Sequence, residues 1–486
     1  MSFLGKLVRW YREQVALTTG DIKKYVSAEK RVKIAIVASP ILTLVSYLVL
    51  YPFFEDPLLG IAIIVILATA PWLTMIDVVT SVHNFSKNIE EEMPFVVAMV
   101  AGVANTGTEL IEALKFLIKT KVFKAFKILA ERFWLLSETL GALDSLRLLS
   151  RMLKGRGRLF ILEYVSTLAS GTALQYLRDR AIDFVKTAEV EFEKSMTIRM
   201  MLVMTTSMLF ALLPVILISI TMLYTIEIAE LRTSTETPTW LLAIPGIIAI
   251  VTVVMCTLMP SYPLASRVII EKKTMSLYRL LFAIGATMLT LPVVLLLSTN
   301  NISMFKDLAS IVAVTSIIFG APSFISIFRA LNLNLNDIVE SIANHVRVYR
   351  SMYLYRDEKL YDLTRKAVRP WLADYIKEST EFFKLIGDVD PNVLELFVLF
   401  IFEVQRIKRR TSIYMLIMLI TTIVSPFLAV ATLQLGETFR QTGLIIVMGY
   451  ITTLSFAYIA SKLATGGNIS TLLPGIATLI YTFLIS

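Results

Sequence analysis

The residues of this chain with the greatest chemical potential form two charged clusters, and both suit recognition of a charged partner better than catalysis. The first is an acidic run at Glu90, Glu91 and Glu92. Placed at a helix start, such carboxylates are stabilised by the helix dipole, and they could equally dock to a basic partner surface. Both interpretations remain open at this stage.

The second cluster is basic and surrounds two glycines, Gly155 and Gly157. Its members are Arg147, Arg151, Lys154, Arg156 and Arg158. Cations gathered at a helix end are favoured by the helix dipole, and they could also bind an acidic partner or lipid head groups. We take Arg151, Lys154, Arg156 and Arg158, together with the acidic run, as candidate docking residues for a partner protein.

Residues that would make the chain an enzyme are not visible. The sequence has no Gly-x-x-x-x-Gly-Lys phosphate loop and no His-Glu-x-x-His zinc helix. Its two histidines, His83 and His345, have no Cys or His at ligand spacing. We therefore expect no catalytic residues, no metal site and no cofactor.

Composition places the chain among membrane proteins. It has 486 residues, of which 56% are hydrophobic, and a mean hydropathy of +0.71. Nine apolar runs approach or exceed the roughly 20 residues that a helix needs to cross a bilayer. They lie at residues 34–54, 58–80, 200–226, 239–261, 278–299, 308–328, 412–433, 443–461 and 468–486.

Charge placement orients these runs. With the N-terminus in the cytoplasm, only Arg232, Lys306 and Arg440 of the 47 Lys and Arg residues fall outside the predicted cytoplasmic parts and their flanks. The predicted order is a cytoplasmic segment, two spans, a helical block, two spans, a loop, two spans, a second block, two spans and a ninth span. The corresponding ranges are 1–33, 34–80, 81–199, 200–261, 262–277, 278–328, 329–411, 412–461 and 468–486.

The two halves of the chain repeat in parallel orientation. Pro94 to Leu114 aligns without gaps on Pro322 to Ile342, which pairs Glu109 with Asp337 and Glu112 with Glu340. The second copy is divergent, because Leu335 stands where the first has Gly107. Asn334 and Asn336 could supply its turn instead.

Helical periodicity and capping signals divide each block further. In the first block they predict helices at 91–104, 108–119, 122–139, 141–154, 158–169 and 172–199. In the second they predict helices at 336–350, 356–366, 370–386 and 391–410. The predicted fold is an all-α polytopic membrane protein with two cytoplasmic helical-bundle domains.

Two stretches of the first block carry a family resemblance. The acidic run is followed by Pro94, a helix, a Thr-Gly break at Gly107 and the segment Glu109 to Leu114. Further on, Ser170-Gly171-Thr172-Ala173-Leu174-Gln175-Tyr176-Leu177 resembles a Ser-Gly-Gly-x-Leu-x-x-Tyr-Leu signature. Together they are similar to the type II secretion system F domain family (GspF/PilC/TadB-like) and its archaeal type IV pilus and archaellum counterparts. The residues that carry this resemblance, in structural roles, are Pro94, Gly107, Glu109, Glu112, Ser170, Gly171, Leu174 and Leu177.

The resemblance implies a non-enzymatic platform in the cell membrane for assembling a type IV pilus-like filament. Its implied partners are a hexameric secretion ATPase, prepilin subunits, membrane lipid and a second copy of the chain as a dimer, with no nucleic acid. The alternatives are a transporter or permease built from parallel repeats, and a membrane scaffold or signalling protein. The spans carry no ionisable residue through their middle, which disfavours an ion-coupled carrier.

One modification site is also predicted. Asn301-Ile302-Ser303 is a glycosylation sequon in a predicted outside loop, whereas the sequon at Asn84 falls in the first cytoplasmic block. The topology therefore predicts that of these two only Asn301 can be glycosylated.

Overall fold

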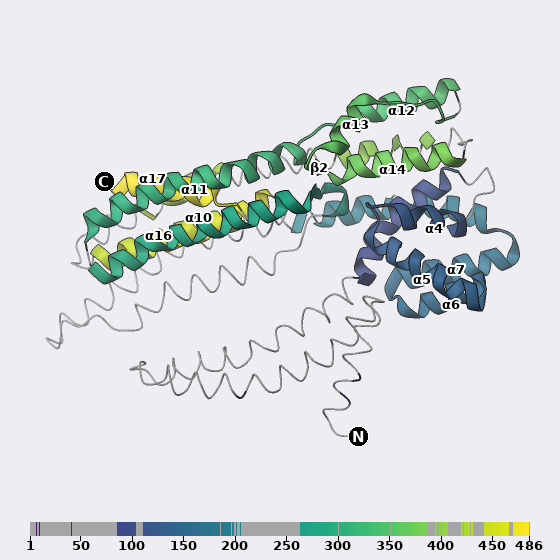
Figure 1. Cartoon of the computed structure of the whole chain (residues 1–486), viewed down its shortest axis with the longest axis horizontal. Helices are drawn as coiled ribbons and strands as arrows, with labels where there is room; N and C mark the ends of the chain where they lie inside the picture. Colours follow the sequence, from purple (N-terminus) through teal and green to yellow (C-terminus); the bar gives the residue numbers. More distant parts are fainter. Residues whose placement is uncertain are drawn as a thin grey trace. The chain divides into compact units, whose positions relative to one another are not determined.

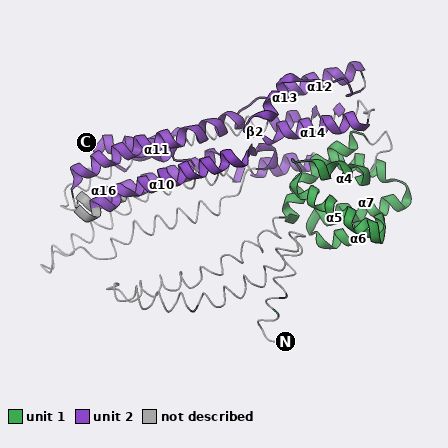
Figure 2. Cartoon of the chain, in the orientation of Figure 1, with its two compact units in different colours: residues 1–184 green, residues 185–486 purple. Residues whose placement is uncertain are grey.

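The computed structural model describes about three fifths of the chain. The described segments are 85–103, 110–184, 186–195, 197–198, 263–299, 301–349, 351–386, 401–406, 422–427, 442–465 and 470–485, with isolated positions elsewhere. They fall into two compact units, residues 1–184 and residues 185–486 (Figure 2). The described part is mostly helical (Figure 1).

Unit 1 is a bundle around one buried helix at residues 85–101. Every residue from Glu92 to Val103 is buried, which includes the last two turns of this helix and the two residues after it. The helix is therefore buried on all its faces, as is typical of a helix at the centre of a domain. Around it lie α4 (Leu110–Lys119), α5 (Lys124–Leu140), α6 (Ala142–Met152), α7 (Gly155–Ser170) and a helix at 173–184. Successive helices from α4 to α7 pack on one another.

The predicted helix boundaries in this unit are close except at the first helix. That helix is already formed at Phe85, not at residue 91, so the acidic run lies within it and Pro94 is an interior residue. The prediction that Glu90, Glu91 and Glu92 sit at a helix start is therefore wrong. The break at Gly107 and the residue Glu109 lie outside the described residues.

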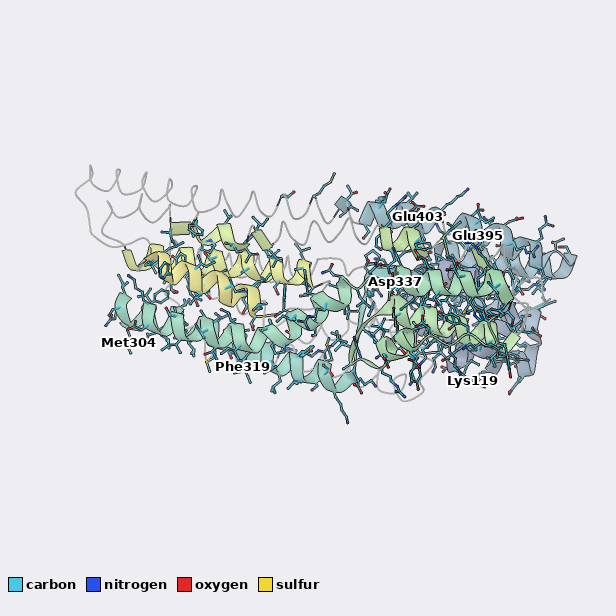
Figure 3. All side chains as sticks on the ribbon, turned by 90° about the horizontal axis from the view of Figure 1, so that it is seen from above. Lys119, Met304, Phe319, Asp337, Glu395 and Glu403 are labelled. Carbon is cyan, nitrogen blue, oxygen red and sulfur yellow. The ribbon has the colours of Figure 1, made fainter. Side chains whose placement is uncertain are left out.

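Unit 2 contains an apolar bundle of α10 (Lys272–Thr299), α11 (Ile302–Leu331), α16 (Thr442–Ala464) and α17 (Leu472–Ile485) (Figure 1). Two runs in the described part are long and apolar enough to cross a membrane, Lys272–Leu296 and Ile302–Tyr349. The second run comprises α11 and the polar helix α12 (Asn336–Tyr349), and its apolar residues belong to α11. Figure 3 labels Met304 and Phe319 on α11 and Asp337 on α12.

The bundle helices differ in length from the predicted spans. α10 and α11 begin six residues before the predicted 278 and 308. α17 has 14 residues, about 21 Å at 1.5 Å per residue, which is shorter than the roughly 30 Å of a bilayer core. Seven of its residues are buried against the other helices, so it is an interior helix of the bundle. The first four predicted spans lie outside the described residues, apart from Pro40, Met201 and Thr205.

Glycines and hydroxyls let α17 approach its neighbours closely. A Cβ on Gly320 of α11 would overlap the backbone of Leu472, and one on Gly475 would lie 2.9 Å from the carbonyl oxygen of Ala313. At this contact Ser470 Oγ donates to the Gly320 carbonyl at 2.9 Å and Thr471 Oγ1 donates to Ser316 O at 3.0 Å. Small residues with buried Ser and Thr hydrogen bonds are the usual means by which helices associate in lipid.

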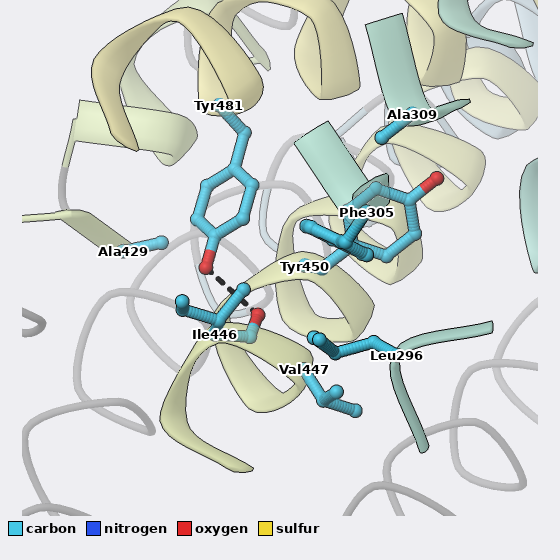
Figure 4. Packing of buried hydrophobic residues seen from close by; sticks show 8 residues of the cluster. All are labelled: Leu296, Phe305, Ala309, Ala429, Ile446, Val447, Tyr450 and Tyr481. Carbon is cyan, nitrogen blue, oxygen red and sulfur yellow. Dashed lines mark hydrogen bonds between the residues drawn. The ribbon is translucent and has the colours of Figure 1, made fainter. Parts of the chain in front are cut away.

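A second contact region of the bundle is aromatic (Figure 4). Phe305 packs edge-on against Tyr450, with ring centroids 5.4 Å apart. Tyr450 donates its hydroxyl to Leu289 O, and Tyr481 donates to Ile446 O, both at 2.9 Å. Each buried phenol thus has a backbone acceptor, which removes the cost of burying its hydroxyl.

The rest of unit 2 is the second block. It contains α12, α13 (Glu358–Arg365) and α14 (Trp371–Ile386), which match three predicted helices within about two residues. Residues 401–406 of the fourth predicted helix are also helical. Asn336 N donates to Asn334 Oδ1 at 3.2 Å, which confirms the turn predicted there.

The prediction of an all-α fold missed a short β-ribbon. Strands β1 (Val268–Ile270) and β2 (Val368–Pro370) pair antiparallel, with Ile269 opposite Arg369. β1 follows the short 3₁₀ helix η3 (Leu264–Ser266) and directly precedes α10, whereas β2 directly precedes α14. The ribbon therefore ties the start of α14 to the start of α10, a link between segments about 100 residues apart in the sequence.

The described parts of the repeat agree in two respects. The alignment shifts residue numbers by 228, so the end of the first helix at residue 101 corresponds to 329, near the end of α11 at Leu331. Leu110 and Leu114 of α4 correspond to Ile338 and Ile342 of α12, and all four are buried. The two copies thus break at similar positions and bury the same face of the helix that follows.

Candidate functional site

The acidic run serves mainly inside unit 1. Glu92 is only 4% exposed, and its carboxylate accepts hydrogen bonds from Ala125 N at 3.0 Å and Phe126 N at 2.9 Å. These donors belong to the first turn of α5, whose N-cap residue, Phe123, has no side-chain acceptor to offer. Glu92 therefore caps α5 from 33 residues away, and a buried carboxylate engaged in this way cannot meet a partner.

Glu90 performs the same task for α7. Its Oε1 accepts from Arg156 N at 2.8 Å, at a helix whose N-cap residue is Lys154. Gly155 has a φ of +61°, and a Cβ there would overlap Oε1 of Glu90. Glycine at this position thus supplies both the left-handed backbone and the space for the carboxylate.

A third helix start is held in the same manner. Leu110 N, at the start of α4, donates to the hydroxyl of the fully buried Tyr164 at 3.0 Å. Three helices of unit 1 thus receive N-terminal acceptors from side chains distant in sequence. The sequence held a signal for this arrangement. Phe123 and Lys154 stand at the N-cap positions of α5 and α7, and neither side chain can accept a hydrogen bond, so each helix needs an acceptor from another part of the chain.

The basic cluster lies on the surface at the turn between α6 and α7. Arg151, Lys154, Arg156 and Arg158, here called the basic corner, are all exposed. Leu153 between them is buried, and Gly157 packs against Ile89, with its added Cβ only 3.2 Å from Ile89 Cγ2. The corner is therefore fixed to the central helix by Leu153, Gly157 and the bond from Glu90.

The structure thus brings the two predicted clusters together, with Glu90 beneath the basic corner. A positively charged corner is suited to an anionic partner surface because of its exposed side-chain charges, since Glu90 already occupies the N-terminus of α7. Arg147, which was counted with the cluster, pairs instead with Asp144 at 3.2 Å. Glu91 is partly buried and has contacts within the protein.

The second family-like stretch has the geometry of a helix end. Gly171 has a φ of 75° and a ψ of 10°, the left-handed conformation, and Thr172 N donates to Thr167 O at 3.0 Å. This confirms the stop predicted at Gly171. Leu177 is fully buried, Leu174 is partly buried, and Ser170 and Glu112 are exposed.

Beside this turn, a small polar network joins α7 to the helix at 173–184. Tyr176 Oη donates to Glu163 Oε2 at 2.8 Å, and Arg180 Nη2 donates to the same oxygen at 2.5 Å. Burial, and next the bond to the Glu163 carboxylate, raise the pKa of Tyr176 above its ordinary value. The network fixes the angle between the two helices and contains no group suited to nucleophilic catalysis.

The remaining predicted sites have clear positions. Asn301 is exposed and caps α11, since its Oδ1 accepts from Met304 N at 3.2 Å and from Ser303 Oγ at 2.8 Å. His345 contacts the rings of Tyr349 and Tyr355, with centroids 4.7 and 5.2 Å away. No group of three or more His, Cys, Asp and Glu side chains that could hold a metal occurs within the described ranges. His83 and Asn84 lie outside those ranges.

Comparisons with known proteins add no relative. No family model matches the chain, and neither the curated proteins nor the solved structures contain a match.

Proposed function

We propose that this chain is a non-enzymatic membrane platform for assembling a type IV pilus-like filament. In this proposal it couples a cytoplasmic secretion ATPase to the insertion of prepilin subunits. The basic corner of unit 1 is the observation that carries the proposal, because it offers an exposed, rigidly seated cationic surface for the acidic side of such an ATPase. The resemblance of the first block to the type II secretion F domain supports it.

The proposal includes a membrane topology with nine spans and a cytoplasmic N-terminus. The apolar bundle of α10, α11, α16 and α17 belongs to the membrane part, where its apolar faces meet lipid and prepilin helices. Both helical blocks face the cytoplasm, and two copies of the chain form the working platform. An outside position for Asn301 also follows from this topology.

Charge reversal at the basic corner tests the docking role. We would replace Arg151, Lys154 and Arg158 by Glu and leave Arg156, because a carboxylate at position 156 would lie beside Glu90. The three side chains are exposed, so each reversal should alter stability by no more than about 0.5 kcal/mol. We expect normal accumulation in the membrane, weaker co-purification with the ATPase, and loss of surface filaments in electron micrographs.

A matched control separates a specific surface from total charge. Replacing Lys87, Lys119 and Lys127 by Glu changes the net charge of unit 1 by the same amount as the basic-corner variant. Like that variant, it alters only side chains outside the buried core. This variant should bind the ATPase and form filaments as the parent does. If the basic-corner variant also binds and assembles normally, the docking surface lies elsewhere. The neighbouring genes distinguish the transporter alternative. If they encode a substrate-binding protein instead of a secretion ATPase, the transporter alternative is favoured.

Cysteine labelling tests the topology in a variant whose single native Cys256 is replaced by Ser. A cysteine is then introduced at one exposed position at a time. Lys119→Cys and Lys359→Cys should be labelled only from the cytoplasmic side, whereas Ser303→Cys should be labelled from outside intact cells. Labelling of Lys119→Cys by an impermeant reagent added outside would refute the nine-span scheme.

A further inference from the structure

The second block is joined to the apolar bundle at two places. The first is the chain itself, since α11 ends at Leu331 and α12 begins at Asn336, so residues 332–335 form the connection. The second is the β-ribbon, which pairs the strand before α10 with the strand before α14. Figure 1 shows β2 between the bundle helices and α14. A body attached at one place can turn about it, whereas a second attachment removes that freedom.

The first connection has the form of a hinge. Asn332 leaves the helical conformation with a φ of −93° and a ψ of 5°, and its N–H donates to Phe328 O at 3.1 Å. Asn334 is exposed, and its side chain accepts from Asn336 N. Hinge motions are absorbed by a few residues in short connections of this kind, at the ends of helices. By itself, the connection at 332–335 would let the second block swing relative to α11.

The second connection is a ladder of backbone bonds. Its two ends are closed by Trp371 N, which donates to Arg267 O, and by Glu271 N, which donates to Ala367 O, both at 2.9 Å. Ile269 and Arg369 face one another midway between these two pairs. Bonded and non-bonded pairs alternate in an antiparallel ladder, so Ile269 and Arg369 form a bonded pair as well. The central pair therefore holds the two strands together by their backbones.

Side chains fix the direction in which α14 leaves the ribbon. Arg369 Nε donates to both carboxylate oxygens of Asp374 in the first turn of α14, at 2.7 and 2.8 Å, and Arg369 Nη1 donates to Lys366 O at 2.9 Å. Trp371 is buried and stacks on Tyr375, with ring centroids 5.4 Å apart and the planes 5° apart. The start of α14 is thus held to β2 by an ion pair and by buried aromatic packing.

On the bundle side, the ribbon is held to both α10 and α11. β1 directly precedes α10, and both strands pack on α11. Tyr278, in the second turn of α10, is hydrogen-bonded to Ser326 near the end of α11, with 2.8 Å between Oη and Oγ. Further along, Ser316 Oγ of α11 donates to Gly285 O of α10 at 3.3 Å. The ribbon, α10 and α11 therefore form one continuous packed body.

We propose that the β-ribbon locks the second block to α10 and α11, so that the block and these two helices move as a single lever. A displacement of α14 then passes directly to α10 and α11 instead of being absorbed at residues 332–335. The lock consists only of contacts within unit 2 and does not depend on the platform function.

Spin-label distances measured by double electron–electron resonance test the lock, with the full chain in lipid nanodiscs. Labels are placed on cysteines introduced at two exposed positions, Ser276 of α10 and Leu385 of α14, with Cys256 replaced by Ser. The parent should give one narrow distance distribution. Ile269→Pro removes an N–H from the central pair of the ladder, so the distribution should broaden to at least about twice the parent's width as the block turns about 332–335.

Ile270→Pro is the matched control. Ile270 stands opposite Val368 in a pair of the non-bonded kind, so its N–H points away from β2. The native Pro370 occupies the same kind of position in β2, which is where a strand tolerates proline. Ile270→Pro therefore adds the same ring but keeps the ladder bonds, and its distribution should be as narrow as the parent's.

A second label pair reports on the block itself. Labels at the exposed positions Glu358 of α13 and Leu385 of α14 should give a narrow distribution in the parent and in both proline variants. Broadening of this pair in Ile269→Pro would mean that the ribbon folds the block instead of locking it. A broad distribution between Ser276 and Leu385 in the parent, an unchanged one in Ile269→Pro, or equal broadening in Ile270→Pro would also overturn the proposal.

Discussion

Removing the carboxylate of Glu92 should loosen α5 more than any change to an exposed acid. Glu92 accepts the N–H groups of Ala125 and Phe126 at the start of α5, and it is buried in the central helix of unit 1. The Glu92→Ala variant leaves both donors without their acceptor in a position that water does not reach. The residues that flank the start of α5 offer no substitute, because Phe123 has no polar side chain.

The expected magnitude follows from the two lost bonds. Each buried donor left unsatisfied costs about 1–3 kcal/mol, so the variant should lose at least about 2 kcal/mol of local stability. Because 1.4 kcal/mol changes an equilibrium constant tenfold, a loss of about 2 kcal/mol should accelerate amide exchange in the first turn of α5 about thirtyfold. By contrast, Glu138→Ala changes an exposed acid near the other end of the same helix and should stay within about 0.5 kcal/mol of the parent.

Hydrogen–deuterium exchange with mass spectrometry measures this directly in the full chain. Peptides that cover residues 122–130 should exchange faster in Glu92→Ala and should be unaffected in Glu138→Ala. The bundle of unit 2 provides an internal reference, because the contacts described for α10, α11, α16 and α17 join these helices to one another. Exchange in 122–130 that remains within about threefold of the parent would mean that the two bonds contribute too little to hold α5, and the capping argument would fail.

Three further predictions address unit 2. Gly320→Leu places a side chain where the backbone of Leu472 lies, so α17 should separate from α11, and the variant should elute as aggregate in size-exclusion chromatography. Asp374→Asn weakens the ion pair in which Arg369 Nε donates to both carboxylate oxygens of Asp374, at 2.7 and 2.8 Å. Because Asp374 is only 8% exposed, the change should cost about 3 kcal/mol and speed proteolysis at the β-ribbon. Burial raises the pKa of Tyr355 above its ordinary value of 10.0, so the stability that its neutral form contributes is complete below about pH 10 and is lost as the pH rises further. Tyr355→Phe should therefore reduce the dependence of helical circular dichroism on pH above 10, and an unchanged alkaline transition would contradict this.

The helices of both blocks were largely predictable, because amphipathic periodicity and turn residues are local signals. α12, α13 and α14 match their predicted ranges closely, and Gly171 and Asn334 form the predicted breaks. The β-ribbon was not predicted, since three-residue strands are too short for a period-2 pattern and gain their stability from pairing across about 100 residues. A pocket of the second block was equally invisible, because it arises where the turn before α13 meets the far half of α14.

Sequence alone determined that the chain is helical and strongly apolar, and it located the charged clusters and the breaks between helices. These properties depend on composition and on neighbours a few residues apart. The tertiary structure alone decided what the charges do, because it brings Glu90 to Arg156 across 66 residues and Glu92 to Ala125 across 33. The acidic run thereby became the internal support of two helix starts, while the basic corner stayed exposed. A helix N-terminus without a local cap accepts whichever carboxylate the fold brings to it, and only the packing of the helices determines which one arrives.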